Sequence, residues 1–343
     1  MAFTGCTRRT FSSTAASLVA LAAAPALRAQ PRLEKTRLTL ALASMSDFRF
    51  LPVVIAEQLG YFGAQGLELD IGDFPVGSAD VVAGSFEQVI SQHDKGHRVQ
   101  SFVLLSRSPA LSMGISSRAL PHYQSLLNLK GKKVGVNKQG SLSHITATAV
   151  LARGGVSGAE VSFMTVGSGN AALTALRSGQ IDAICHTEPV MTQLEQKGDI
   201  RIIADTRTLK GAFDVFGGPM PMACLYASAD FAQKNPHTVQ ALTNAVVHSL
   251  KWLQTAGPGD IIKTVPEAYL LGDRALYLAA FNKMRDVISP NGLMPEEGPG
   301  TVLRVLSAFD PSIKTGSIDL GRTYSNLFAR QVPELFKARR LGA

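Results

Sequence analysis

Three glycine- and serine-rich turns are the parts of this sequence best suited to binding a ligand. Each turn stands between an apolar, β-branched run and a helix-like stretch. Such a turn exposes the N–H groups of a helix N-terminus, and its hydroxyls add donors, so a small anion could be held there without a cation. Helix capping explains any single turn equally well. The turns are Gly84-Ser85, Gly140-Ser141-Leu142-Ser143 and Gly167-Ser168-Gly169-Asn170.

Two of these turns resemble nucleotide-binding loops. Gly135 and Gly140 have the spacing of a phosphate loop, but Ser141 stands where that motif requires lysine, which excludes it. Residues 167–172 fit the loose dinucleotide fingerprint, with Glu188 downstream as a possible ribose ligand. This weak motif remains an alternative to a shared ligand site.

Hydrolytic and metal chemistry have little support in the sequence. There is no Gly-x-Ser-x-Gly elbow, and Gly96 interrupts the helix that would align His93 with His97. Cys185 and Cys224 are expected to be buried, apolar thiols rather than redox groups. We therefore predict no catalytic residue, no metal and no cofactor.

The elements that must position the turns alternate strand-like and helix-like patterns, which favours an α/β fold with parallel sheets covered by helices. One group of expected strands covers residues 38–42, 67–71, 80–83 and 99–105, and a second covers 134–137, 161–166, 181–185 and 201–204. Helices are expected at 52–59, 236–254 and 273–288, and Gly60 follows the first as its C-cap. Since ligands of open α/β sheets bind at the carboxyl ends of parallel strands, three turns at such ends predict one site.

Length and composition agree with a folded, two-lobed protein. A chain of 343 residues exceeds the size at which single cores stop growing, and its 45% hydrophobic and 17% charged residues exclude a disordered chain. The net charge of +8 suits an anionic ligand, but no basic stretch is interleaved with aromatic residues. Nucleic acid is therefore not an expected partner.

Residues 1–29 have the pattern of an export signal. Arg8 and Arg9 precede an apolar run, and small residues follow up to Ala29. The twin arginines and the weakly apolar run resemble a twin-arginine signal, and the run is too short for a membrane-spanning helix. We expect a periplasmic protein.

Several short motifs together resemble a known family. These are residues 56–62 (AEQLGYF) with Gly66-Leu67, residues 130–136 (KGKKVGV) with Gly140-Ser141, residues 175–183 (ALRSGQIDA), and Glu188-Pro189. From about residue 36 to 252 the chain resembles the nitrate, sulfonate and taurine type, NMT1- and THI5-like, solute-binding proteins of ABC transporters.

The resemblance implies a periplasmic binding protein type II fold with two α/β lobes joined by a two-segment hinge. Residues 30–118 would form the first part of lobe I, 119–220 lobe II, and 221–343 the return to lobe I with C-terminal helices. The chain would cross between lobes near 115–120 and 221–227. It would be a monomeric, non-catalytic receptor for a small-molecule ligand, with permease and ATPase subunits as partners and membrane contact only through the permease.

The resemblance also implies site residues. The loop after the first strand, with Ser44, Ser46, Asp47 and Phe48, would line the interlobe cleft, and Glu188 would lie at a matching turn. Phe48 would either stack on a planar ligand or pack internally, and Arg49 is expected to face solvent. The predicted ligand-binding residues are Ser44, Ser46, Asp47, Phe48, Gly84, Ser85, Gly140, Ser141, Ser143, Gly167, Ser168, Asn170 and Glu188.

One departure from the family pattern affects the expected site. Residues 73–76 run almost directly into 77–81, so a helix of about ten residues seen in the family is missing. This predicts altered specificity or impaired binding. Two other functions stay open: an enzyme of pyrimidine (thiamine precursor) biosynthesis with the same fold, and a periplasmic ligand sensor. The sequence does not fix the ligand.

Overall fold

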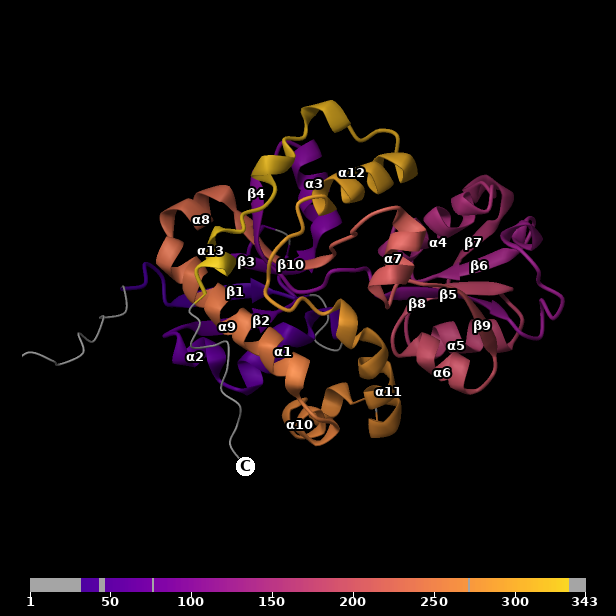
Figure 1. Ribbon diagram of the computed structural model, residues 1–343, viewed down its shortest axis with the longest axis horizontal. Helices are drawn as coiled ribbons and strands as arrows, with labels where there is room; N and C mark the ends of the chain where they lie inside the picture. The colour runs from indigo at the N-terminus through magenta and orange to yellow at the C-terminus, as the bar shows by residue number, and fades with distance from the viewer. Residues whose placement is uncertain (1–31, 43–46, 76, 271, 333–343) are drawn as a thin grey trace, which may run out of the picture. The chain divides into compact units, whose positions relative to one another are not determined.

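The computed structural model describes residues 32–42, 47–75, 77–270 and 272–332. They form two five-stranded sheets, ordered β2-β1-β3-β10-β4 and β7-β6-β8-β5-β9 (Figure 1). The expected signal segment 1–29, Ser44 and Ser46 lie outside these residues. The first sheet contains β1 (Arg37–Ala41), β2 (Glu68–Gly72), β3 (Val81–Ser85), β4 (Val99–Leu104) and β10 (Ala223–Ser228). The second contains β5 (Leu111–Ser116), β6 (Lys133–Val136), β7 (Ser162–Thr165), β8 (Ala183–Thr187) and β9 (Ile200–Asp205).

Both sheets are mixed, whereas the sequence predicted parallel sheets. In the first sheet β1 is parallel to β2 and β3, but β10 is antiparallel to β3 and β4. In the second, β5 is antiparallel to β8 and β9. The reason is topological: the chain leaves each sheet at the carboxyl end of a strand and enters the other at the carboxyl ends of its parallel strands. The entering strand must therefore run the opposite way.

The first crossing lies between Leu104 and Leu111, and not near residues 115–120 as the sequence suggested. The earlier crossing follows from β5, a fully buried central strand that the sequence analysis did not identify. The return crossing ends where β10 begins at Ala223, within the expected range.

The two crossing segments are hydrogen-bonded side by side. Leu105 N donates to Ala223 O at 2.7 Å, Met222 N donates to Ser106 O at 2.9 Å, and Ser108 Oγ donates to Thr206 O. Adjacent crossings of this kind form the two-segment hinge that the sequence predicted.

The expected helices are present within a few residues. On one face of the first sheet, α1, α2 and α9 bury a large apolar core, and Gly60 ends α1 with a φ of 68°. On the other face, α3 and α12 pack with part of β10 and β4. The bounds are α1 (Leu51–Gln58), α2 (Tyr61–Ala64), α3 (Phe86–Asp94), α8 (Ala229–Lys234), α9 (Pro236–Thr255), α10 (Pro258–Thr264), α11 (Arg274–Met284), α12 (Gly298–Phe309) and α13 (Leu327–Arg330).

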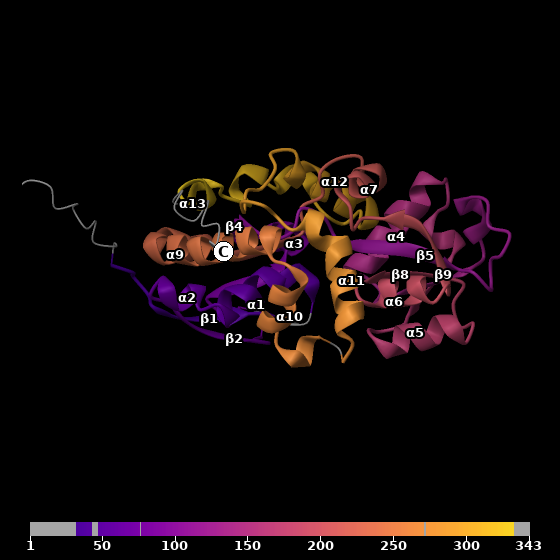
Figure 2. The same cartoon turned by 60° about the horizontal axis from the view of Figure 1, so that its bottom comes forward.

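The second sheet has helices on both faces, and several of these helices contact helices of the first sheet. Its helices are α4 (Leu142–Arg153), α5 (Asn170–Arg177), α6 (Val190–Gln196) and α7 (Leu209–Phe216). α12 packs on α4, and α11 packs on α6, as both views show (Figure 2). Within the part of the chain that the structure describes, no helix is long and apolar enough to cross a membrane.

The link from β2 to β3 contains no helix among its described residues, as the sequence indicated. Only residues 73–80 connect two strands that flank β1, although parallel neighbours are usually joined by a dozen residues or more. The uncovered face of β1 and β2 carries polar side chains, and Arg37 pairs with Glu68 there. Both strands alternate polar and apolar residues, which is typical of a sheet with one face in water.

Candidate functional site

The turn after β3 begins α3 with a capping box. Ser85 is the N-cap, its side chain accepts from the N3 backbone N–H, and Gln88 Oε1 accepts from Ser85 N at 3.2 Å. Gly84 has little room for a side chain, because a Cβ there would lie 2.6 Å from Gln88 Oε1 and 2.8 Å from Tyr226 Cε1. Both predicted residues of this turn line a cavity described below.

The turn after β6 is largely satisfied by its own hydrogen bonds. Ser141 Oγ donates to Lys138 O at 2.5 Å and lies 3.0 Å from the hydroxyl of Ser143, which accepts from Asn137 N at 2.9 Å. Gly140 is exposed, with a φ of 76°. These contacts hold the turn together before α4, whose N-cap residue Ser141 makes no side-chain cap bond to the helix.

The turn after β7 lies beside the ends of β6 and β8. Gly167 O accepts from Asn137 Nδ2 at 3.0 Å and from His186 Nε2 at 2.8 Å, while Ser168 and Asn170 are exposed. The structure therefore brings together the carboxyl ends of β6, β7 and β8. His186 and Asn137 were not predicted, since neither stands in a motif of the sequence.

Asp47 and Arg49 form a bidentate ion pair after β1. Arg49 Nη2 lies 2.6 Å from Asp47 Oδ2, Arg49 Nε lies 3.0 Å from Asp47 Oδ1, and each side chain is only 17% exposed. Arg49 thus does not face solvent, contrary to expectation. Asp47 also accepts from Arg49 N at 2.9 Å, as the N-cap of the short helical turn Phe48–Phe50.

The electrostatic surroundings of Asp47 include a residue of the second sheet. Burial by itself raises the pKa of Asp47, but the charge and hydrogen bonds of Arg49, with a smaller effect of His186, outweigh it and lower the pKa. Burial lowers the pKa of His186, so its ring is neutral near pH 7. Because Asp47 and His186 each affect the pKa of the other, the two side chains lie in the same region although they come from different sheets.

Glu87, on the first turn of α3, is a further polar group near Arg49. Burial raises the pKa of Glu87, and the charge of Arg49 opposes this. Its Oε2 is buried without a hydrogen-bond partner among the described residues. A carboxyl oxygen in this state can accept a hydrogen bond from a bound molecule.

Phe48 packs inside the first lobe. Its side chain is buried, and its ring centroid lies 4.6 Å from that of Tyr277 on α11. Of the two expectations for Phe48, the structure supports internal packing.

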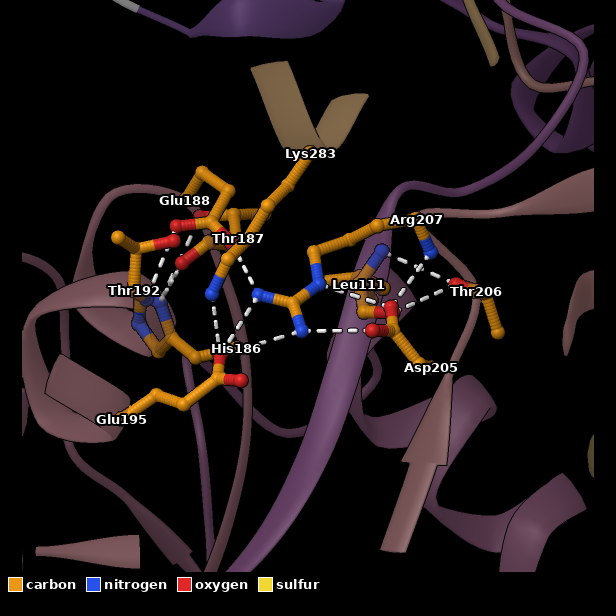
Figure 3. A network of polar contacts seen from close by, with 10 residues as sticks. All are labelled: Leu111, His186, Thr187, Glu188, Thr192, Glu195, Asp205, Thr206, Arg207 and Lys283. Atoms are coloured by element: carbon orange, nitrogen blue, oxygen red, sulfur yellow. Dashed lines mark hydrogen bonds and ion pairs between the residues drawn. The ribbon is translucent and has the colours of Figure 1, made fainter. Parts of the chain in front are cut away.

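Glu188 belongs to a buried polar network (Figure 3). Its Oε1 lies 2.5 Å from Arg207 Nη1, and its Oε2 accepts from Thr192 N at 3.0 Å. Arg207 also forms a bidentate pair with Asp205, at 2.8 Å from Nε and 2.6 Å from Nη2. Both carboxylate oxygens of Glu188 are thus bonded to other residues of the protein. Glu188 can therefore affect a ligand only through these residues.

The same network connects helices of the two sheets. Glu195 on α6 lies 3.4 Å from Arg207 and 2.5 Å from Lys283 Nζ on α11 (Figure 3). Arg207 follows β9 directly, at the start of the return crossing. The network therefore connects the hinge at Arg207 with the contact between α6 of the second lobe and α11 of the first. No local pattern predicts this network, because Lys283 and Glu195 are 88 residues apart in the chain.

A large cavity opens beside Asp47 and Arg49. Its volume is about 1040 Å³, and it runs along the face of β3 and β10 that the link 73–80 leaves open. Ser85 and Gln88 are among the residues that line it. The described residues contain no cluster of three metal-ligating side chains. Cys185 and Cys224 are free thiols, and both are buried, as the sequence predicted.

Comparisons with known proteins identify relatives of this chain. Residues 47–256 match the model of the family described as NMT1/THI5 like. A solved structure of a Bordetella bronchiseptica RB50 protein is 44% identical, with a TM-score of 0.81, and covers 90% of this chain and 100% of its own. The riboflavin-binding protein RibY of Chloroflexus aurantiacus is 27% identical over 158 residues, 42% of this chain and 44% of its own length. The chain thus spans less than half of that curated relative.

Two more distant solved structures share the fold. The alkanesulfonate-binding protein SsuA of Xanthomonas axonopodis pv. citri, bound to MOPS, is 19% identical with a TM-score of 0.63, covering 84% of this chain and 96% of its own. The periplasmic nitrate-binding protein NrtA of Synechocystis PCC 6803 is 14% identical with a TM-score of 0.62, covering 89% and 91%. Because the family model spans more than half of the chain, this protein belongs to the NMT1/THI5-like family, and it has the two-lobed periplasmic binding protein fold.

Proposed function

We propose that this protein is the periplasmic receptor of an ABC importer and binds a small organic or anionic nutrient between its lobes. The observation that carries this proposal is the convergence of buried polar groups at the carboxyl ends of strands from both sheets. Asp47 and Arg49 follow β1, and His186 is the last residue but one of β8 on the other sheet. Asp47 and His186 each affect the pKa of the other, which supports their closeness. Ligands of open α/β sheets bind at such strand ends.

The hinge supports a receptor that closes on its ligand. Two adjacent crossing segments join the lobes, and their hydrogen bonds keep them together. Rotation about such a pair of segments is the usual closure of two-lobed binding proteins. The permease and ATPase subunits would recognise the closed form. The signal in residues 1–29 would direct export of the protein to the periplasm, where it would be a monomer.

The relatives define the ligands to be tested. Their names record alkanesulfonate, nitrate and riboflavin binding. Within the predicted set, Asp47, Gly84 and Ser85 border the large cavity, and we retain Ser141, Ser143, Gly167, Ser168 and Asn170 as the contribution of the second lobe. We assign Glu188 a positioning role through Arg207.

Differential scanning fluorimetry of the mature chain would test this function against nitrate, taurine, alkanesulfonates, aromatic carboxylates, and thiamine and riboflavin precursors. A true ligand at a hundred times its Kd should stabilise the folded state by about 2.7 kcal/mol. The ligand should be recovered unchanged from the mixture. Stabilisation by none of these compounds would contradict the receptor function, and conversion of the ligand would favour an enzyme.

A further inference from the structure

The large cavity, called here the sheet-face cavity, is a part of the first lobe that the predicted turns do not explain. Its floor is the face of β3 and β10 with Val82 and Tyr226. Gln88 and Gln92 of α3 form one wall, and residues of the link 73–80 form the opposite wall. It begins at the strand ends near Ser85, where the proposed cleft lies, and extends toward the other end of β3.

The origin of the sheet-face cavity is the short link between β2 and β3. Eight residues suffice to pass over β1 but not to add a helix that would cover β3 and β10 as well. Polar residues on β1 and β2 fit a face left in water. Over β3 and β10 the floor is apolar, which predicts that something apolar covers it when the protein is functioning.

The volume of this cavity argues for a large occupant. About 1040 Å³ is at the upper end of the range found for pockets that bind organic ligands. Nitrate or a short alkanesulfonate would fill a minor part of it. The aromatic rings of Phe74, Tyr226 and Phe231 contribute to its lining and offer contacts to a flat, apolar body.

The charges around the cavity differ between its two ends. At the cleft end Asp47 and Arg49 neutralise each other. At the far end Lys95 and Arg98 are exposed and take part in no ion pair among the described residues, and His97 lies between them.

Two acidic residues also face the sheet-face cavity. Asp80 is held by Lys35 at 2.6 Å and by Thr39. Asp73 lies in the wall formed by the link. Asp73 follows the carboxyl end of β2 and so lies toward the cleft end of the cavity. Because Lys35 pairs with Asp80, the charges of Lys95 and Arg98 leave the far end with an excess of positive charge.

We propose that the sheet-face cavity binds the body of an elongated organic anion, with an aromatic or other apolar middle and its anionic group at Lys95 and Arg98. The proposal rests on the receptor function and specifies its ligand class. The other end of the ligand would reach the strand ends at Asp47 and Ser85, where closure of the second lobe would cover it. Small inorganic oxyanions would then be poor ligands.

Isothermal titration calorimetry of the mature full chain tests this with a series of anions of increasing length. The probes are nitrate, ethanesulfonate, benzoate, 2-naphthoate and biphenyl-4-carboxylate. We expect affinity to rise by at least tenfold from benzoate to the longest binder, and nitrate to bind more weakly than any aromatic probe. Tightest binding of nitrate or ethanesulfonate would overturn the proposal and leave the receptor function intact.

Variants separate the cavity from the cleft. Gln92→Trp should fill the cavity, and Lys95→Ala with Arg98→Ala should remove the far-end charge; each should weaken the longest binder by tenfold or more. Lys197→Ala with Arg153→Ala removes the same charge from exposed sites on the second lobe and is the matched control. Val82→Phe is a second filling variant if Gln92→Trp does not fold.

Each outcome decides the proposal. Unchanged affinity in folded filling and charge variants, or equal losses in the matched control, would show that the ligand does not use the sheet-face cavity. A folded wild-type chain that binds none of these anions also overturns the proposal. The receptor function would fail only if the wider fluorimetry screen found no ligand either.

Discussion

Replacement of Arg207 is the perturbation for which the structure allows the clearest estimate. Its side chain is 2% exposed and contacts three carboxylates, of which Glu188 has a fully buried side chain. Arg207→Met leaves Glu188 buried without its cation. Breaking a buried ion pair from one side costs about 3 to 5 kcal/mol, because the remaining charge has lost both water and partner. We expect a loss of this size in the free energy of unfolding at pH 7.5.

The matched comparison is removal of both charges. Glu188→Gln combined with Arg207→Met leaves no buried, unpaired carboxylate from this pair, so the double variant should be more stable than Arg207→Met alone by about 1 to 3 kcal/mol. Lowering the pH protonates the orphaned carboxylate in Arg207→Met, so its defect should shrink toward pH 5. Urea unfolding followed by circular dichroism measures these differences.

Two results of urea unfolding would contradict this role of Arg207. A loss of less than about 1 kcal/mol for Arg207→Met at pH 7.5 would show that the network does not stabilise the hinge side of the second lobe. A defect of the same size at pH 5 and pH 7.5 would show that the orphaned carboxylate is not its cause.

Three further perturbations have expected outcomes. Burial by itself raises the pKa of Glu34, but hydrogen bonds from Thr238 and His237 outweigh it and lower this pKa from 4.5 to about 2. The contribution of Glu34 to the free energy of unfolding is therefore complete above pH 4.5 and is lost as the pH falls toward 2. Glu34→Gln should cost about 1 to 2 kcal/mol in urea unfolding at pH 7 and nothing near pH 2. Lys283→Met removes a half-exposed contact between lobes, so calorimetry should show ligand affinity weakened by less than about fivefold, and a larger loss would contradict a minor role. Gly84→Ala places a Cβ 2.6 Å from Gln88 Oε1 and 2.8 Å from Tyr226 Cε1, and should cost about 1 to 3 kcal/mol in the same unfolding assay. An unchanged stability would mean that both side chains move aside freely.

Local patterns of the sequence predicted the elements well. The helix that begins near Pro52 and ends before Gly60 is present, because proline at the first turn and a left-handed glycine after the last are local requirements. The long helix from Pro236 is also present. The sequence also predicted that no helix lies between β2 and β3, because eight residues cannot form both a helix and its two connections.

The direction of two strands needed the tertiary structure. β5 and β10 are antiparallel to their neighbours because the chain crosses between the sheets at their carboxyl ends. Nothing in the composition of residues 111–116 distinguishes a strand that enters a second sheet from a hinge segment. The sequence analysis therefore placed the first crossing too late.

The sequence by itself determined the α/β class, the two groups of strands and the turns at their ends, because each depends on residues close together in the chain. Tertiary structure decided which polar groups meet there. Arg49 turns back onto Asp47, Phe48 packs on Tyr277, and Glu188 is taken by Arg207. The sheet-face cavity likewise depends on the distance across the sheet between the short link 73–80 and α3. Such contacts depend on distances across the fold, which local spacing does not specify.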